Sequence, residues 1–168
     1  GDKTVVVEHF VPESGIEQVQ HGMLGAADVE VYTAGVVAAH RLQNNVTNIH
    51  DLHKMKVGSV EGKSSDIYLN YKHINTKQYP TVEAGVEALK KGEIDAFVDD
   101  GASLNYYFNK KDKNLTKKIK LIELPNNKEY YCFMSSDPLL VNKINPYLLS
   151  FLESEQWNKL LKKYGLIE

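Results

Sequence analysis

The feature that most constrains the fold is a regular alternation of short apolar runs and capped helices that begins at residue 56. Residues 56–60 (KVGSV) predict a short buried strand, and residues 65–71 predict a helix. Thr81 is the expected N-cap of a second helix and Gly92 its expected end, and residues 93–98 (EIDAFV) then predict a strand buried on both faces. Because a strand–helix–strand–helix order needs crossover connections, it predicts an α/β fold with a parallel-rich sheet and helices packed against it.

The remaining segments outside the C-terminus predict further strands and helices. In chain order they are a strand at 3–12, a helix at 14–22, an ambiguous segment at 26–43, a brief strand at 72–75, a helix at 102–108, and strands at 119–124 and 129–134 that a PNNK turn separates. The ambiguous segment could be a strand, a helix or a crossover between two lobes.

Two amphipathic helices are predicted at the C-terminus. Asp137 caps the first and Pro138 occupies its first turn, whereas Ser154 begins the second and Gly165 ends it. Apolar side chains recur on one stripe of each helix, and we interpret both stripes as core. The stripe residues are Leu140, Ile144, Leu148 and Phe151, followed by Trp157, Leu160, Leu161 and Tyr164.

The composition is that of a globular protein and argues against several classes of function. The 168 residues are 42% hydrophobic and 25% charged, and a net charge of −2 with dispersed lysines disfavours a nucleic-acid-binding surface. No apolar run is long enough to cross a bilayer, and we expect that any targeting peptide was removed or was never present. Cys132 is the single cysteine, which excludes an internal disulfide, and its strand-like surroundings favour a small buried apolar role.

The ends of the two best-defined strands predict a binding site. In an open parallel sheet, ligands bind beyond the carboxyl ends of the strands. The strand at 57–60 leads into Gly62, Lys63, Ser64 and Ser65, which would offer backbone N–H groups, hydroxyls and an ammonium at a helix start, and the strand at 94–98 leads into Asp99 and Asp100. A donor-rich loop beside a carboxylate would suit a zwitterion. Both features have structural alternatives, because serine and aspartate often merely cap a following helix.

Three stretches resemble the type II periplasmic-binding fold, and more narrowly the family-3 amino-acid-binding proteins and the ligand-binding domains of ionotropic glutamate receptors and their prokaryotic potassium-channel relatives. They are NIHDLHKMKVGSVEGKSSDIYL, TVEAGVEALKKGEIDAFVDDGASLNYYF and DPLLVNKINPYLLSFLESEQWNKLLKKYGL, which lie within residues 46–168. The resemblance implies that the loop at Gly62, Lys63 and Ser64 donates to ligand carboxylates. It also implies that Asp100 holds a ligand amino group. Because successive side chains at a strand end point to opposite sides, Asp99 is expected to turn away. The family usually has a small hydroxyl residue where this chain has Lys63.

The resemblance is incomplete in the first lobe. It implies a partial lobe 1 and crossover at 1–50, an α/β lobe 2 at 51–130, and a return strand with C-terminal helices at 131–168 that pack on the short first lobe. In the family an arginine of the first lobe pairs with the ligand α-carboxylate. Arg41, the only arginine, matches that position only with a gap, and it could equally be a surface residue of the linker.

The resemblance implies a non-enzymatic domain that captures a small polar solute of amino-acid type in a cleft between lobes. Lobe closure would act on a channel or transporter, within the same polypeptide or beside it, in the periplasm or outside the cell, and a homo-oligomer is compatible with this function. The stretch VYTAGVVAAHRLQNNVTNIHDL favours a channel-linked domain, because it resembles the segment that follows the last pore helix of glutamate-receptor channels. The alternatives are an interaction domain that lost its ligand and an enzyme on the same fold.

No catalytic pair, cofactor or metal site is expected. No nucleophile and base stand at a recognisable spacing. His50 and His53 are three residues apart and could in principle bind a metal, but an exposed capped turn is the favoured interpretation.

Overall fold

The computed structural model describes residues 4–11 and 30–167, and the predicted helix at 14–22 therefore lies outside the described residues. The chain divides into two compact units, Gly1–Ala34 with Lys128–Glu168 and Gly35–Asn127. Two long strands, β2 (Glu30–Arg41) and β6 (Ile119–Ser135), contribute residues to both units.

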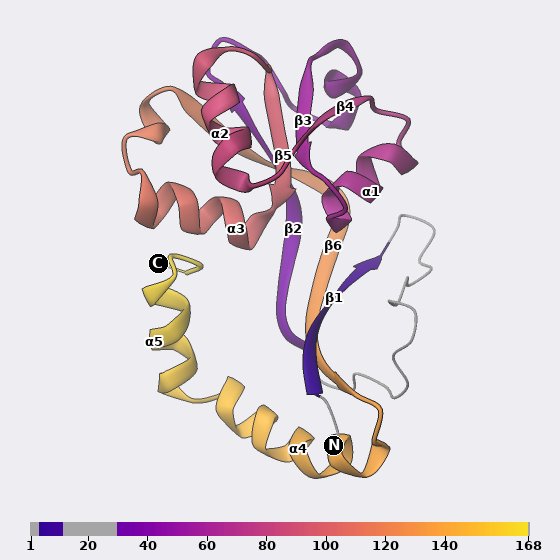
Figure 1. Cartoon of the computed structure of the whole chain (residues 1–168). Helices are drawn as coiled ribbons and strands as arrows, with labels where there is room; N and C mark the ends of the chain where they lie inside the picture. Colours follow the sequence, from indigo (N-terminus) through magenta and orange to yellow (C-terminus); the bar gives the residue numbers. More distant parts are fainter. Residues whose placement is uncertain (1–3, 12–29, 168) are drawn as a thin grey trace. The chain divides into compact units, whose positions relative to one another are not determined.

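The larger unit, Gly35–Asn127, is built on a mixed, parallel-rich sheet with the strand order β6-β2-β5-β3-β4 (Figure 1). Strand β3 (Val57–Val60) pairs in parallel with both β4 (Thr76–Tyr79) and β5 (Ala96–Asp100). Strand β2 pairs antiparallel with β5. The predicted α/β class with a parallel-rich sheet is confirmed.

Helices connect these strands, and the predicted capping residues bound α2. They are η1 (Ile49–Lys54), α1 (Ser64–Tyr71), α2 (Val82–Lys91), α3 (Gly101–Tyr106), the π-helical η2 (Tyr107–Lys111) and η3 (Leu115–Lys117). Thr81 caps α2 by accepting a hydrogen bond from the Ala84 N–H at 3.1 Å. Gly92 ends α2 with a left-handed φ of 79°, a conformation that glycine adopts without strain.

Three predicted strand boundaries differ from the structure. The strand expected at 72–75 is a turn after α1, in which His73 has a positive φ of 59°, and β4 follows it at Thr76–Tyr79. Strand β5 starts at Ala96 and continues through Asp100. The predicted PNNK turn is absent from the described residues because β6 runs unbroken through it, pairing with β1 from Lys128 onward. Strand pairing here overrides a local turn preference.

The core of the larger unit lies between its sheet and the helices that cover it. Phe97 of β5 is fully buried with Val86 and Leu89 of α2. A side chain at Gly85 of α2 would overlap the ring of Phe97, so α2 approaches the sheet closely only because residue 85 is glycine. The parallel pairing of β3 with β5 brings their carboxyl ends to one edge.

The smaller unit contains β1 (Thr4–Val11), which pairs antiparallel with β6, and two C-terminal helices, α4 (Pro138–Leu152) and α5 (Glu155–Lys163). Asp137 and Ser154 cap these helices as predicted. The prediction that both apolar stripes are core is wrong for several members. Of the stripe residues only Leu161 is buried, whereas Phe151, Leu160 and Tyr164 are between 38% and 44% exposed.

No helix among residues 30–167 combines the length and the apolar character needed to cross a membrane.

Candidate functional site

The carboxyl ends of β3 and β5 bring a lysine and two aspartates together. Lys63 follows β3 as the residue before α1, and Asp99 and Asp100 are the last residues of β5. The Lys63 Nζ atom lies 2.8 Å from Asp99 Oδ2 and 2.9 Å from Asp100 Oδ2. The two loops that the sequence predicts at one edge therefore meet through a three-membered ion cluster.

The cluster is largely withdrawn from solvent. The side chains of Asp99 and Asp100 are 0% and 5% exposed, while that of Lys63 remains 29% exposed. The Ser65 hydroxyl donates to Asp99 Oδ1 at 3.4 Å. Asp100 also accepts hydrogen bonds from the backbone N–H of Ser103 at 2.7 Å and from its hydroxyl at 2.9 Å. Lys63 is thus the most accessible charged member of the cluster.

The two carboxyl groups have different proton affinities. Burial, reinforced by the charge of Asp100, raises the pKa of Asp99 to about 7 despite the opposing effect of Lys63. Burial also acts on Asp100, but the Lys63 charge and the hydrogen bonds from Ser103 together hold the pKa of Asp100 below its usual range. Burial alone would lower the pKa of Lys63, yet the two carboxylates raise it above its ordinary value. Asp100 therefore carries the permanent negative charge, and Asp99 is the group that titrates near neutrality.

A second buried carboxylate supports the loop that carries Lys63. Asp66 on α1 is 3% exposed and accepts hydrogen bonds from the Ser59 hydroxyl at 2.8 Å and the Gln78 side-chain amide at 2.9 Å. Longer bonds reach Asp66 from the Thr76 hydroxyl and the Gly62 N–H, each at 3.3 Å. These bonds join β3, β4 and α1, so they fix the position from which the Lys63 side chain extends.

The loop adopts the conformation that its glycine permits. Gly62 has a positive φ of 77°, and Ser64 is the first residue of α1. The serine N-cap considered for this helix is wrong, because Lys63 occupies the N-cap position and makes no side-chain cap bond. For the second loop the capping alternative is confirmed, since Asp100 caps α3 through the Ser103 N–H.

The expectation that Asp99 turns away from the loop is also corrected by the structure. Side chains alternate along a regular strand, which would leave only one of two successive residues on the site. Asp100 has φ −66° and ψ 150° and already serves as a helix cap, and both carboxylates reach the same ammonium. In the sequence, only its position next to Asp100 indicated that Asp99 could belong to the site. Ser103 had a weaker indication, because it stands three residues after Asp100, the spacing of a helix cap.

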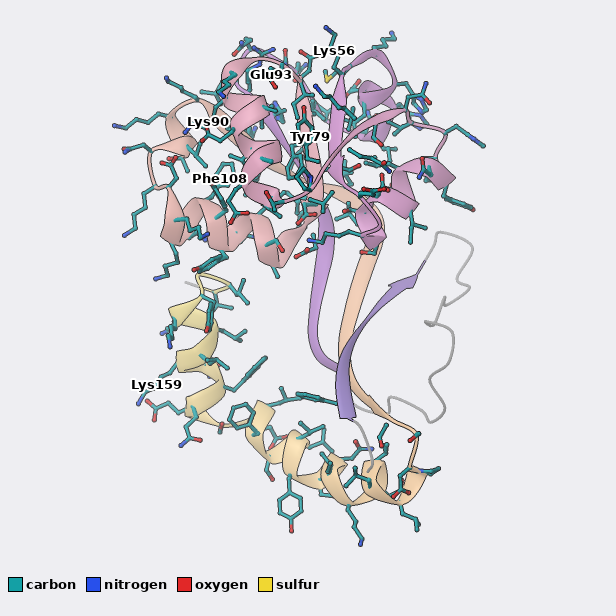
Figure 2. The ribbon with its side chains drawn as sticks, in the orientation of Figure 1. Lys56, Tyr79, Lys90, Glu93, Phe108 and Lys159 are labelled. Carbon is teal, nitrogen blue, oxygen red and sulfur yellow. The ribbon has the colours of Figure 1, made fainter. Side chains whose placement is uncertain are left out.

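Arg41 lies at the opposite edge of the sheet from Lys63, where β2 ends and β5 begins. Its Nη2 atom is 3.0 Å from Asp95 Oδ1, beside the start of β5, and Asp95 Oδ2 accepts the Lys56 N–H at 2.9 Å. Figure 2 labels Lys56 and Glu93 at this edge, away from the starts of α1 and α3. The structure brings Gly62, Lys63, Ser64, Ser65 and Asp100 to one edge of the larger unit and does not bring Arg41 to them.

Within the described ranges, no group of three or more histidine, cysteine or acidic side chains has an arrangement that suits a metal ion. His50 and His53 lie in η1, whose start is capped by Asn48 and Asp51 in a reciprocal capping box, and their rings are stacked 6.3 Å apart.

Comparison with known proteins identifies the fold. No family model matches the sequence, and no curated protein matches it. The solved structures that resemble the chain include the GluR0 ligand-binding core from Nostoc punctiforme in complex with L-glutamate, with 22% identity and a TM-score of 0.70 over 84% of this chain. The chain has the type II periplasmic-binding-protein fold. It spans 65% of that ligand-binding core, so part of the fold seen there has no counterpart in these 168 residues.

Two further structures are similar to the same extent. The arginine-, lysine-, histidine-binding protein ArtJ from Geobacillus stearothermophilus is 23% identical with a TM-score of 0.67, over 85% of this chain and 63% of its own length. An ancestral amino-acid-binding protein described as a precursor of cyclohexadienyl dehydratase is 20% identical with a TM-score of 0.68, over 85% of this chain and 62% of its own.

Proposed function

We propose that this chain is a non-enzymatic binding module that captures a small polar solute carrying a carboxylate, of amino-acid size. The observation that carries the proposal is the meeting of Lys63, Asp99 and Asp100 at the carboxyl ends of two parallel strands. Sheets of this kind bind their ligands at such an edge. Partly buried charged groups with displaced pKa values at this position are typical of functional sites.

Each residue of the site has a distinct proposed role. The loop at residues 62–65 receives the carboxylate at the start of α1, because a helix start favours negative charge. Asp100, held ionised by Lys63 and Ser103, is the negative end of the site, and the family resemblance implies an ammonium group there. Arg41 is proposed as a structural residue of the opposite edge, because its partner is Asp95.

We further propose that solute capture acts on a membrane channel or transporter, in the periplasm or at the cell surface. The glutamate-bound core among the similar structures and the stretch at 31–52 that resembles a channel-linked segment support this proposal. Oligomerisation of the module is compatible with it.

A second candidate is an interaction domain that no longer binds a solute. The observation that favours it is the cluster itself, because Lys63 pairs with both carboxylates. An enzymatic role receives no comparable support, although one similar structure is described as a precursor of a dehydratase.

Isothermal titration calorimetry separates the two candidates. A panel of amino acids and other small carboxylates is titrated into the chain and into Asp100→Asn, with the exposed Lys91→Ala as a control for a surface charge change. The binding module predicts saturable heat with at least one carboxylate, with an affinity that Asp100→Asn changes and that Lys91→Ala leaves unchanged. Absence of binding across the panel would favour the interaction domain.

A further inference from the structure

Lys63 occupies the position in which a ligand ammonium would be expected. An ammonium group has three N–H donors, and Lys63 directs two of them to Asp99 and Asp100 at 2.8 and 2.9 Å. These are the lengths of strong charge-assisted hydrogen bonds. The two carboxylates that could hold the amino group of a solute therefore already hold one that belongs to the protein.

We infer that Lys63 determines the specificity of the site by filling its ammonium position, so that the module selects carboxylate solutes that lack an α-amine. This inference rests on the proposed function and names its solute class. The solute carboxylate meets the start of α1 beside Lys63, and the two carboxylates beyond it are already paired with the Lys63 ammonium.

The charges that face Lys63 explain the selectivity. They are Asp99 on one side and Asp100 on the other, with the Ser65 hydroxyl bonded to Asp99. A solute with an amine must either displace Lys63 or place a second cation against the same two carboxylates. Displacement is unfavourable because Lys63 is tethered, and a tethered group competes at an effective concentration of order millimolar or higher.

An amine-free carboxylate meets no such competition. The third N–H of Lys63 is not used by either aspartate, and its side chain is 29% exposed, so it can donate toward an arriving anion. Lys63 thus contributes to anion binding while it excludes an ammonium. A small hydroxyl residue at this position, as in the family that the sequence resembles, would leave the carboxylates open to a ligand amine.

Calorimetry with matched pairs of solutes tests this inference. Each pair differs only by the α-amine: L-glutamate with glutarate, L-leucine with 4-methylpentanoate, and L-lysine with 6-aminohexanoate. The ratio of the two affinities within a pair is measured for the wild type, Lys63→Ala and the control Lys91→Ala. A merely structural role for Lys63 would change both affinities of a pair alike and leave their ratio constant.

We expect the affinity of the wild type and of Lys91→Ala for the amine-free member to exceed that for the amino acid by about tenfold or more. That ratio is the effect of one charge-assisted hydrogen bond. Lys63→Ala should reverse the preference. If Lys63→Ala does not fold, the double variant Lys63→Ala/Asp99→Asn keeps a single carboxylate at Asp100 and gives the same readout.

Preferential binding of the amino acids by the wild type, or a ratio that Lys63→Ala leaves unchanged, would overturn the inference while the binding module stands. If folded wild type and folded variants bind no member of any pair, the proposed function itself is overturned, and the inference with it.

Discussion

Charged residues lie at both ends of the strands in the larger unit, at the Arg41 edge and at the Lys63 edge, and their ion pairs differ in burial. At one edge Arg41 pairs with Asp95, and both side chains are partly exposed, at 25% and 31%. At the other edge Lys63 meets Asp99 and Asp100, whose side chains are almost fully buried. The Arg41 pair has one acid for one base, whereas the Lys63 cluster has two acids for one base.

The contrast shows which charged cluster can be a site. Asp95 accepts from Arg41 and from the Lys56 N–H, and so ties β2, the start of β3 and the start of β5 together. Water screens this pair, and an exposed pair contributes little to stability. Burial at the Lys63 edge instead raises the pKa of Asp99 to about 7. The cluster has one more acid than base, and its Lys63 side chain remains partly exposed to solvent. A cluster that is not neutralised on its own can respond to a ligand.

The largest effect is expected from removing the shared cation. Lys63→Met keeps the length of the side chain but leaves two buried carboxyl groups without a base, and breaking a buried pair costs about 3–5 kcal/mol. We expect the free energy of unfolding in urea to fall by about 3 kcal/mol at pH 8, the lower part of that range, because Asp99 can take up a proton. The loss should be smaller at pH 5, where Asp99 is neutral. An equal loss at both pH values would contradict the assigned role of Asp99.

Next in size is the difference between the two aspartates in solute binding. Asp100 stays ionised, whereas Asp99 is neutral in part of the population near pH 7. In the Lys63→Ala background, where a ligand amine can reach the carboxylates, Asp100→Asn should therefore weaken amino-acid binding about tenfold to a hundredfold, and Asp99→Asn less than tenfold. Calorimetry on both variants, with Lys91→Ala as control, gives the comparison. A larger loss in Asp99→Asn would reverse the assignment of the permanent charge.

The Lys63 edge should contribute to the pH dependence of stability through Asp99. Asp99 has a folded-state pKa above its unfolded value of 3.8, so its contribution to stability is fully present below that value and is lost as the pH rises toward about 7. Urea unfolding between pH 4 and pH 8 should show this decline in the wild type. Asp99→Asn should flatten it, and the exposed control Lys91→Ala should not.

The smallest effect is expected at the Arg41 edge. Arg41→Ala should reduce the free energy of unfolding by about 1 kcal/mol or less, because the pair with Asp95 is partly exposed. Solute affinity should not change, since Arg41 lies away from Lys63 and the two aspartates. A tenfold loss of affinity in Arg41→Lys, which keeps the charge but not the planar fork, would return Arg41 to the ligand site.

The elements with strong local signals could be predicted from the sequence. Thr81 and Gly92 bound α2, and Asp137 and Ser154 start the last two helices, because a cap is satisfied by residues within one turn of it. The break expected at PNNK was wrong, since β6 is held by pairing with the distant β1. The apolar stripes of α4 and α5 predicted the helices but not their burial, because periodicity reports which face is apolar and not what covers it.

The candidate site was likewise predicted in part from the sequence and decided in part only by the tertiary structure. The order of strands and helices determined that the loop at Gly62–Ser65 and the pair Asp99-Asp100 would meet, since parallel strands joined by a crossover end at one edge. Only the tertiary structure decided that Lys63 reaches across to both carboxylates and that Arg41 does not belong with them. A long flexible side chain such as that of Lys63 can reach several partners. Burial in the packed molecule decides which partners it contacts and how their pKa values shift.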